Sequence, residues 1–401
     1  MHKPNAFRLI AASVATVLML AACGGGGGGD NEGTPGPPPS SRFGASGNLA
    51  NICTVEGQKR FVRSYLDEHY LWYNEITEVN AAQYASAADY FNALLIKTPD
   101  ATGQPRDRFS AVIPTASAEN VLARAADVTT AQANHTPYVP VSRVFLTPSG
   151  RRVGYVQFND HATGAQDDLI SAFRNVRDTG LQDLVLDLRL NSGGFLYIAL
   201  TAASMITGPQ NNGKIFEQLQ YNDKRQPETE ANTLRFGATV QFAESLYSRG
   251  DPIPQLGLPR VYILASSQTC SSSESIINGL RGVDVQVILI GQTTCGKPYG
   301  FHRKDNCGLA YFPLEFKGSN ARGFGDYTTG FRPTCTVTDN PQVRMGSAAD
   351  PLLAAAQFHI ENGSCPSGTA TAQSSATPDA SVREAQPARP AWAGRLLQPQ
   401  R

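Results

Sequence analysis

The sequence has no excess of charge of either sign. Its 401 residues contain 34 Lys plus Arg and 34 Asp plus Glu. A protein that binds DNA or RNA needs clustered Lys and Arg to contact phosphates. The charge balance therefore argues against a nucleic acid as partner.

The N-terminal apolar run is too short to be a membrane span. It extends from Leu9 to Ala22, which is fourteen residues, and it follows Lys3 and Arg8. A spanning helix needs about 20 apolar residues. A charged start followed by a short apolar run is typical of a secretory signal, so residues 1–22 are predicted to be a signal peptide.

Small residues precede a cysteine at the end of this run. Leu20-Ala-Ala-Cys23 resembles the lipobox of bacterial lipoproteins. The resemblance implies cleavage before Cys23, lipidation of Cys23 and an extracytoplasmic chain anchored to the membrane, with Gly24 implying the outer membrane of a two-membrane cell. Residues 23–50 are rich in Gly and Pro and predict a flexible tether, which favours this interpretation. The alternative is an ordinary signal peptide whose cysteine forms a disulfide.

The cysteines do not have the spacing of a zinc site, since the sequence has no Cys-x-x-Cys pair with a matching histidine pair. Six cysteines remain beyond Cys23: Cys53, Cys270, Cys295, Cys307, Cys335 and Cys365. An even number in an exported protein predicts up to three disulfides, and six cysteines allow 15 pairings that the sequence cannot separate.

Hydrophobic periodicity divides the rest of the chain. Apolar residues at helical spacing predict a small helical N-terminal domain over 51–110, followed by a connector over 111–140. Residues 141–365 are predicted to be one α/β domain, because nearly continuous apolar runs alternate with amphipathic stretches. The predicted strands are 153–158, 184–190, 261–265 and 285–290, and the predicted helices are 166–177, 196–206 and 273–280. Residues 211–242 are predicted to be an insertion or lid, and 366–401 a disordered tail.

A run of three serines opens the last of these helices. In Cys270-Ser-Ser-Ser-Glu274, Ser271 and Glu274 have the spacing of a capping box, which is a purely structural arrangement. The same position suits a nucleophile, because a helix N-terminus offers unpaired amides and a positive dipole end to a developing oxyanion. This motif alone does not decide between the two.

Two further motifs follow predicted strands. Lys297 lies in a Gly-bounded turn after 285–290, and a lysine can act as a base for a serine when burial lowers its pKa. The stretch from Asp187 to Gly194 ends in two glycines, which allow the backbone to approach a ligand closely.

Together these motifs resemble the serine peptidases called C-terminal processing or tail-specific proteases. The matching elements are Asp-Leu-Arg-x-Asn-x-Gly-Gly at 187–194, Ser-x-Ser-Glu at 271–274 and Gly-Lys at 296–297, and the resemblance covers about 141–339. The end of the helical segment, Asp107-Arg-Phe-Ser110, is also similar to exported bacterial members. The resemblance implies a ClpP/crotonase-like core.

The resemblance also implies roles for individual residues. Ser271 would be the nucleophile and Lys297 would be the base. Ser272 and Ser273 are alternatives to Ser271, because three consecutive serines leave the alignment with the family motif ambiguous. The oxyanion hole would combine the amide of Ser272 with that of Gly193 or Gly194. Asp187, Arg189 and Asn191 are expected to hold the strand-end turn rather than to touch substrate, and Glu274 is expected to support the site by its place in the motif. No metal or other cofactor is expected.

Two departures from the family pattern leave alternatives open. Many members have Gln four residues after the lysine, where this chain has Phe301. They also carry a PDZ domain, for which the connector at 111–140 is too short.

The motifs and the lipobox together lead us to expect a lipid-anchored serine endopeptidase acting on proteins or peptides. Two alternatives stay open: a ligand-binding protein on the same scaffold, as in the retinoid-binding protein of the eye, or an esterase or amidase for small substrates.

A further alternative is that the Cys270 thiol is the nucleophile and His302 its base. In an oxidising compartment, a disulfide at Cys270 is favoured over a free thiol. The other histidines considered, His69, His135, His161 and His359, show no pairing in sequence that would build a triad, and they are predicted to be surface or core residues.

Overall fold

The computed structural model describes residues 42–118 and 138–367. The predicted signal peptide, Cys23 and nearly all of the predicted tail lie outside these described residues. Within the described ranges, none of the helices combines the length and the apolar character that crossing a membrane would require.

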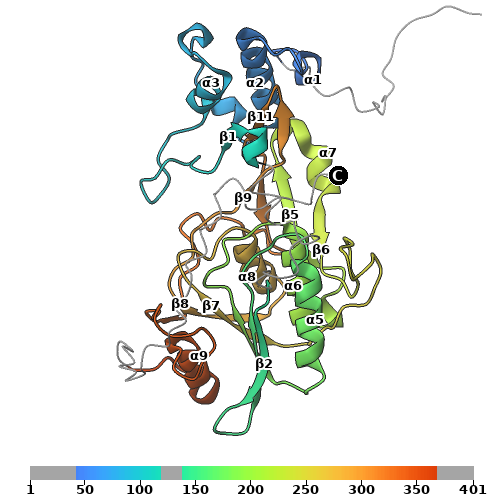
Figure 1. The fold of residues 1–401 in the computed structure, drawn as a ribbon, viewed down its shortest axis with the longest axis vertical. Helices are drawn as coiled ribbons and strands as arrows, with labels where there is room; N and C mark the ends of the chain where they lie inside the picture. The colour runs from blue at the N-terminus through green and yellow to red at the C-terminus, as the bar shows by residue number, and fades with distance from the viewer. Residues whose placement is uncertain (1–41, 119–137, 368–401) are drawn as a thin grey trace, which may run out of the picture. The chain divides into compact units, whose positions relative to one another are not determined.

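The largest sheet has six strands in the order β13-β8-β7-β4-β3-β2 (Figure 1). Its strands are β2 (Val141–Leu146), β3 (Arg152–Gln157), β4 (Asp183–Asp187), β7 (Arg260–Ala265), β8 (Gln286–Gly291) and β13 (Cys335–Thr336). All neighbouring pairs are parallel except β2 with β3. The four predicted strands are confirmed, and their continuous apolar runs reflect burial on both faces of a parallel sheet.

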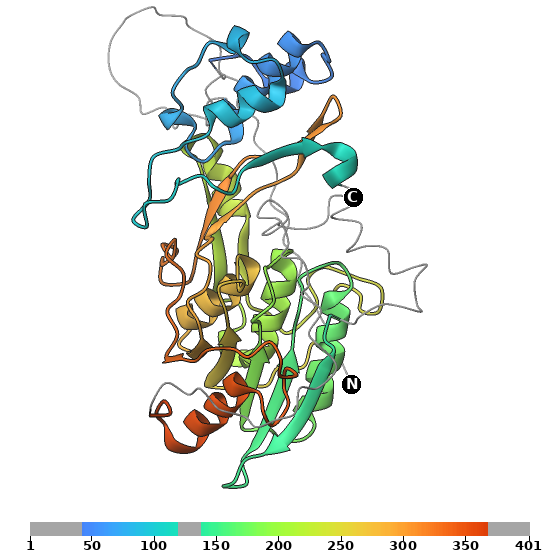
Figure 2. The ribbon, with the colours of Figure 1, turned by 60° about the vertical axis from the view of Figure 1, so that its left-hand side comes forward.

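Helices cover both faces of this sheet (Figure 2). Helices α5 (Ala165–Arg177), α6 (Leu196–Ile206) and α8 (Ser272–Gly282) lie on one side, and α9 (Pro351–Asn362) packs against β4, β7 and β8. Alternate residues of β7 face opposite ways: Val261 and Ile263 join the larger apolar cluster, whereas Tyr262 and Leu264 pack with α9. The expected α/β class with a ClpP/crotonase-like core is confirmed.

Two smaller antiparallel sheets continue the structure, in the orders β6-β5-β12-β9 and β1-β11-β10. Their strands are β1 (Ala111–Pro114), β5 (Ile215–Tyr221), β6 (Thr233–Arg235), β9 (Tyr299–Gly300), β10 (Lys304–Asn306), β11 (Leu309–Phe312) and β12 (Phe316–Ser319). The segment 211–242, expected to be an insertion or lid, instead supplies β5, β6 and α7 (Gln226–Ala231). The start of the predicted connector pairs with β11 as β1.

The helical N-terminal segment contains α1 (Ser46–Leu49), α2 (Val55–His69) and α3 (Ala87–Leu94). Helix α1 falls where the sequence predicted a flexible tether, so that prediction is wrong at 46–49. The reason is a polar contact that composition does not reveal: Glu68 on α2 accepts a hydrogen bond of 2.8 Å from the Ser46 backbone N–H. Phe61 on α2 and Phe91 on α3 are fully buried.

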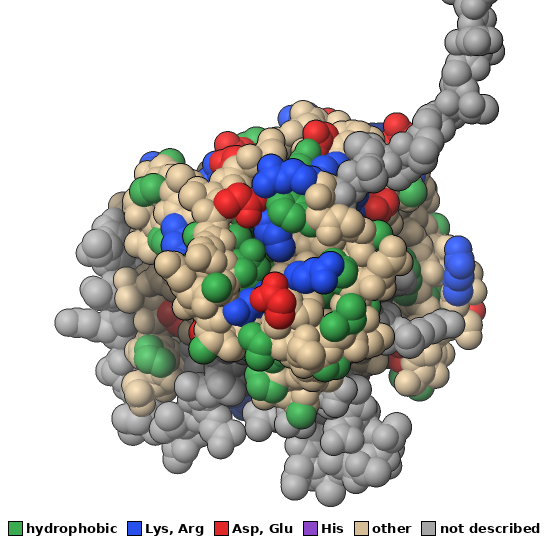
Figure 3. Space-filling model, turned by 90° about the horizontal axis from the view of Figure 1, so that it is seen from above, with side chains coloured by type: hydrophobic (Ala, Val, Ile, Leu, Met, Phe, Trp, Pro, Cys, Tyr) green, Lys and Arg blue, Asp and Glu red, His purple; other side chains and the backbone are tan. Residues whose placement is uncertain are grey.

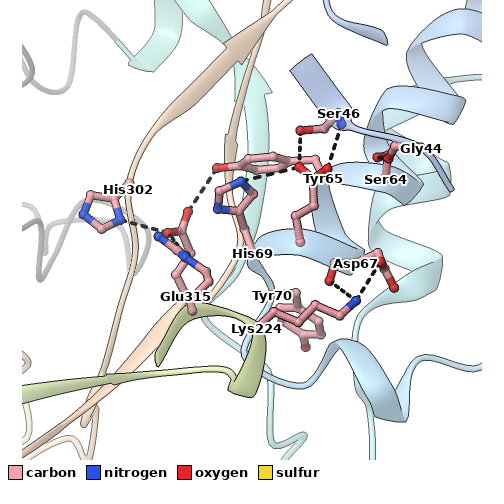
Figure 4. Close-up of polar contacts among 12 residues, drawn as sticks. Gly44, Ser46, Ser64, Tyr65, Asp67, His69, Tyr70, Lys224, His302 and Glu315 are labelled. Atoms are coloured by element: carbon pink, nitrogen blue, oxygen red, sulfur yellow. Dashed lines mark hydrogen bonds and ion pairs between the residues drawn. The ribbon is translucent and has the colours of Figure 1, made fainter. Parts of the chain in front are cut away.

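A buried carboxylate joins α2 to the β5 and β12 sheet (Figure 4). Glu315, directly before β12, accepts hydrogen bonds from Tyr65 Oη (3.0 Å) and Arg225 Nη1 (2.7 Å), and His302 Nδ1 lies 2.8 Å from it. Burial by itself raises the pKa of Glu315, but His302 and Arg225 outweigh burial and lower the pKa to about 2. Glu315 is therefore held as a carboxylate between the helical segment and the second sheet.

The face above the helical segment mixes charges of both signs (Figure 3). Arg42 and Arg63 both pair with Glu78, at 3.1 and 2.6 Å. Within the helical segment, one acidic side chain thus pairs with two basic ones.

The described residues form three disulfides: Cys53–Cys307, Cys270–Cys295 and Cys335–Cys365. They confirm the predicted number and identify the pairing. Because the Cys270 sulfur is bonded to Cys295 and His302 contacts Glu315, the alternative of a Cys270 thiol nucleophile with His302 as base does not fit the structure.

Candidate active site

The three sequence motifs meet at one edge of the large sheet. Strands β4, β7 and β8 are parallel neighbours, so their carboxyl ends lie at the same edge. Residues 187–194 follow β4, 270–274 follow β7, and 291–297 follow β8. Ligands of open α/β sheets bind at this edge. The fold therefore explains why motifs separated by about a hundred residues in sequence come together.

Ser271 occupies a strained turn between β7 and α8. Its φ is 59° and its ψ is −116°, in a region that a residue with a side chain rarely adopts. Its Oγ is buried and has no hydrogen-bond partner among the described residues. Such strain persists only where the surroundings impose it, and it recurs at serine nucleophiles on strand-to-helix turns. The Ser271 hydroxyl therefore lies at the N-terminus of α8 without a hydrogen-bond partner among the described residues.

Glu274 holds the Ser271 and Lys297 segments side by side. Its Oε2 accepts the backbone N–H of Ser271 at 2.9 Å and that of Lys297 at 2.8 Å. Its Oε1 accepts Thr294 Oγ1–H at 2.6 Å and the Gly296 N–H at 2.8 Å. The carboxyl is fully buried, and burial raises its pKa against the effect of these four donors. The glutamate half of the expected capping box is present, because Glu274 accepts the Ser271 backbone N–H, and the same carboxylate also accepts the Lys297 N–H in the lysine turn.

Glu274 also belongs to the only group of potential metal ligands found within the described residues. The sulfurs of Cys270 and Cys295 and a Glu274 oxygen lie within 4.8 Å of one another. The two sulfurs form a disulfide and the carboxylate already accepts four hydrogen bonds. Thiolate is the form in which cysteine binds metals, so this group does not fit a metal site.

Lys297 lies in an apolar, aromatic environment. Its side chain is buried, and Nζ is 4.6 Å from the ring centroid of Phe301 and 5.4 Å from that of Phe109. Burial lowers the pKa of Lys297 to about 7, although the charges of Glu274 and Asp107 act in the opposite direction. A large fraction of Lys297 is therefore neutral near pH 7, which a lysine base requires.

The glycine turn after β4 packs directly on the start of α8. A Cβ on Gly193, whose φ is 91°, would lie 2.8 Å from Ser271 Cβ and 2.9 Å from Ser272 N. Ser272 Oγ donates to the Gly194 carbonyl at 2.7 Å. The Gly193 N–H donates to Asn191 Oδ1 at 3.0 Å. Only glycine fits at 193, both for its backbone conformation and for this close approach.

Asp187 and Arg189 form a buried ion cluster below this turn. Arg189 Nη2 lies 2.7 Å from Asp187 Oδ2 and 2.7 Å from Asp350 Oδ2, and Nη1 lies 2.8 Å from Asp339. Burial by itself lowers the pKa of Arg189, but Asp187 and Asp350 raise it above its ordinary value. Asp350 caps α9, so the cluster connects the end of β4 to that helix.

Three residues near the site were given no role in the chemistry by sequence reasoning. Phe109 comes from the helical segment and reaches Lys297, and Asp107 acts on the Lys297 charge. The similarity of Asp107–Ser110 to exported bacterial family members was the sequence signal that could have identified Asp107 and Phe109. His161 is fully buried and its Nδ1 lies 2.9 Å from Asn191 Oδ1, a contact that no sequence pattern predicted.

Comparison with known families matches both parts of the chain. A sequence model of the peptidase S41 N-terminal domain matches residues 57–111, and a model of peptidase family S41 matches residues 152–303. The second match includes all three motifs. The chain belongs to peptidase family S41. Its S41 relatives include a carboxyl-terminal-processing protease of Picosynechococcus sp., 26% identical over 172 residues, which are 42% of this chain and 36% of the relative.

A second S41 relative is the chloroplastic carboxyl-terminal-processing peptidase 1 of Arabidopsis thaliana. It is 23% identical over 145 residues, which are 36% of this chain and 25% of the relative. The similarity thus spans about a third of one relative and a quarter of the other. A crystal structure described as that of an S41 protease from Bacteroides fragilis NCTC 9343 superposes with a TM-score of 0.60 at 19% identity, covering 76% of this chain and 97% of that one. This last similarity extends the shared S41 fold to most of the chain.

Proposed function

We propose that this S41 family member is a serine endopeptidase with Ser271 as nucleophile and Lys297 as general base. One observation carries the proposal: the buried Glu274 carboxylate ties the strained Ser271 turn to the turn of a buried lysine whose pKa is lowered to about 7. A capping residue alone needs neither an unpartnered buried hydroxyl nor a neighbouring lysine of this kind.

The reaction follows the chemistry of acyl transfer. Neutral Lys297 Nζ takes the Ser271 Oγ proton while Oγ forms a bond to the peptide carbonyl carbon. The resulting ammonium gives that proton to the leaving amine as the C–N bond breaks, which leaves an ester on Ser271. Water then attacks the ester, Lys297 takes the water proton and returns it to Oγ, and the acid product leaves.

The oxyanion would be stabilised by amides at the start of α8 and in the glycine turn. Ser272 N–H lies at the helix N-terminus, next to the nucleophile. Gly193 N–H already donates to Asn191 Oδ1, which favours Gly194 N–H as the second donor. Phe301 occupies the position where many family members have Gln, and its ring replaces a polar contact to the lysine with an apolar one.

We also propose that the protein acts outside the cytoplasm, anchored by lipid at Cys23, on protein or peptide substrates. The lipobox resemblance supports the anchor, and three disulfides support an oxidising compartment. Relatives named as carboxyl-terminal-processing proteases support a protein substrate.

The test uses the full-length protein purified in detergent, with Ser271→Ala and Lys297→Met prepared in parallel. We expect the parent to cleave an unfolded model protein and to be labelled at Ser271 by a fluorophosphonate, and we expect both variants to fold but to lose cleavage. A parent that hydrolyses only small esters or amides would favour the esterase alternative. A folded parent with neither cleavage nor labelling would favour a binding protein. Cleavage by Ser271→Ala would make Ser272 or Ser273 the nucleophile.

A further inference from the structure

The Asn191 side chain is fixed by three contacts. Its Nδ2 donates to the Phe158 carbonyl at 3.1 Å, and its Oδ1 accepts the Gly193 N–H at 3.0 Å. These two contacts determine which end of the amide is oxygen. The same Oδ1 lies 2.9 Å from His161 Nδ1.

The fixed amide determines the protonation of His161. A carbonyl oxygen can only accept a hydrogen bond, so His161 Nδ1 must carry the hydrogen and donate it. His161 also holds the other end of the turn, because its backbone carbonyl accepts the Phe195 N–H at 2.9 Å. His161, which is fully buried, thus contacts the glycine turn at both ends.

The glycine turn that His161 contacts lies against the serine run at 271–273. Gly194 O accepts Ser272 Oγ–H, and Asn191 O accepts Ser273 Oγ–H at 3.0 Å. A shift of the turn would therefore move the Gly194 amide relative to Ser271. Misplacement of a catalytic group by about 1 Å can reduce a rate by about 100-fold.

We infer that His161 is a positioning residue that, through Asn191, sets the oxyanion-binding amide of the glycine turn. The inference rests on the proposed function of Ser271. His161 does not act as the base; its Nδ1–H determines where the turn lies.

The test compares three substitutions of His161 in the full-length protein. Asn can place an amide N–H near the Nδ1 position, whereas Gln places it near Nε2 and Leu has none. We expect His161→Leu and His161→Gln to lower kcat by about 10- to 100-fold with KM changed less than about 2-fold, and His161→Asn to retain most of kcat. His359→Leu is the control: His359 lies on α9 and contacts Tyr262 on β7, so its substitution should leave kcat unchanged.

Two outcomes would overturn the inference while the parent remains active: His161→Leu with full kcat, or equal losses in the Asn and Leu variants. A parent without cleavage or fluorophosphonate labelling would overturn the proposed function, and the positioning role with it. ¹⁵N NMR of labelled histidine gives an independent readout, because we expect neutral His161 to be protonated at Nδ1. A signal showing hydrogen only at Nε2 would contradict the geometry on which the inference depends.

Discussion

Cys270 and Cys295 form a disulfide that joins the residue directly before Ser271 to the turn that carries Lys297. The same two turns are linked a second time through Glu274. A covalent link and a hydrogen-bonded link thus act on the same pair of segments, so their separate effects can be measured.

Removing the Cys270–Cys295 disulfide should lower both stability and activity. We expect the Cys270→Ala/Cys295→Ala variant to lose about 3 kcal/mol of unfolding free energy, the usual effect of opening a loop of this length. Because the two turns lose a constraint, kcat should also fall. Urea unfolding and peptide hydrolysis measure the two effects.

The matched control is Cys335→Ala/Cys365→Ala. That disulfide spans 30 residues against 25, so its loss should lower stability by a similar amount, but it connects β13 to the chain after α9 and should leave kcat unchanged. Equal kcat losses in both double variants would mean that the Cys270–Cys295 bond has no specific role at the site.

Replacing Glu274 with Gln should disturb both the Ser271 turn and the Lys297 turn. The carboxylate accepts two donors on each oxygen, whereas an amide would turn an NH2 group toward two of them. We expect Glu274→Gln to lose about 3 kcal/mol of unfolding free energy and most of kcat. Glu68→Gln is the control, because Glu68 accepts the Ser46 N–H far along the chain from the motifs. Full activity in Glu274→Gln would contradict this role.

The parts predicted from sequence are those that depend on local pattern. The apolar runs at 153–158 and 261–265 predicted buried strands because a parallel sheet buries both faces. The motif order identified Ser271 and Lys297 as candidates by resemblance. The disulfide pairing and the contact between His161 and Asn191 depend on which distant segments meet, and no local pattern encodes that.

The pKa of Lys297 should make stability depend on pH. Folding lowers this pKa from 10.5 to about 7, so between these pH values the unfolded chain holds a proton that the folded protein has lost. The unfolding free energy contributed by Lys297 therefore rises with pH across this window, by about 5 kcal/mol in total. The difference between the parent and Lys297→Met, measured by urea unfolding from pH 6 to pH 10.5, isolates this effect. If the difference in unfolding free energy did not change with pH, Lys297 would have its ordinary pKa in the folded protein.

Placing Gln at position 301 should raise the pKa of Lys297. The Phe301 ring lies 4.6 Å from Lys297 Nζ, and a Gln carbonyl there would accept a hydrogen bond from the ammonium and favour the charged form. We expect the pH profile of kcat/KM to rise with a midpoint near 7 in the parent and about one unit higher in Phe301→Gln. Phe301→Leu keeps the position apolar and should leave the midpoint close to that of the parent. A downward shift in Phe301→Gln would contradict the argument.

A methyl group at Gly193 should block the site. Gly193 and Gly180 both have positive φ, 91° and 67°, so alanine at either position strains the backbone by about 1–2 kcal/mol. A Cβ at 180 meets no atom within 4 Å, whereas a Cβ at 193 would lie 2.7 Å from the Cys270 carbonyl and 2.8 Å from Ser271 Cβ. We therefore expect Gly180→Ala to react with a fluorophosphonate at the rate of the parent and Gly193→Ala to lose labelling. Equal labelling rates would show that the glycine turn tolerates displacement, and that its contact with Ser271 is not needed for the reaction.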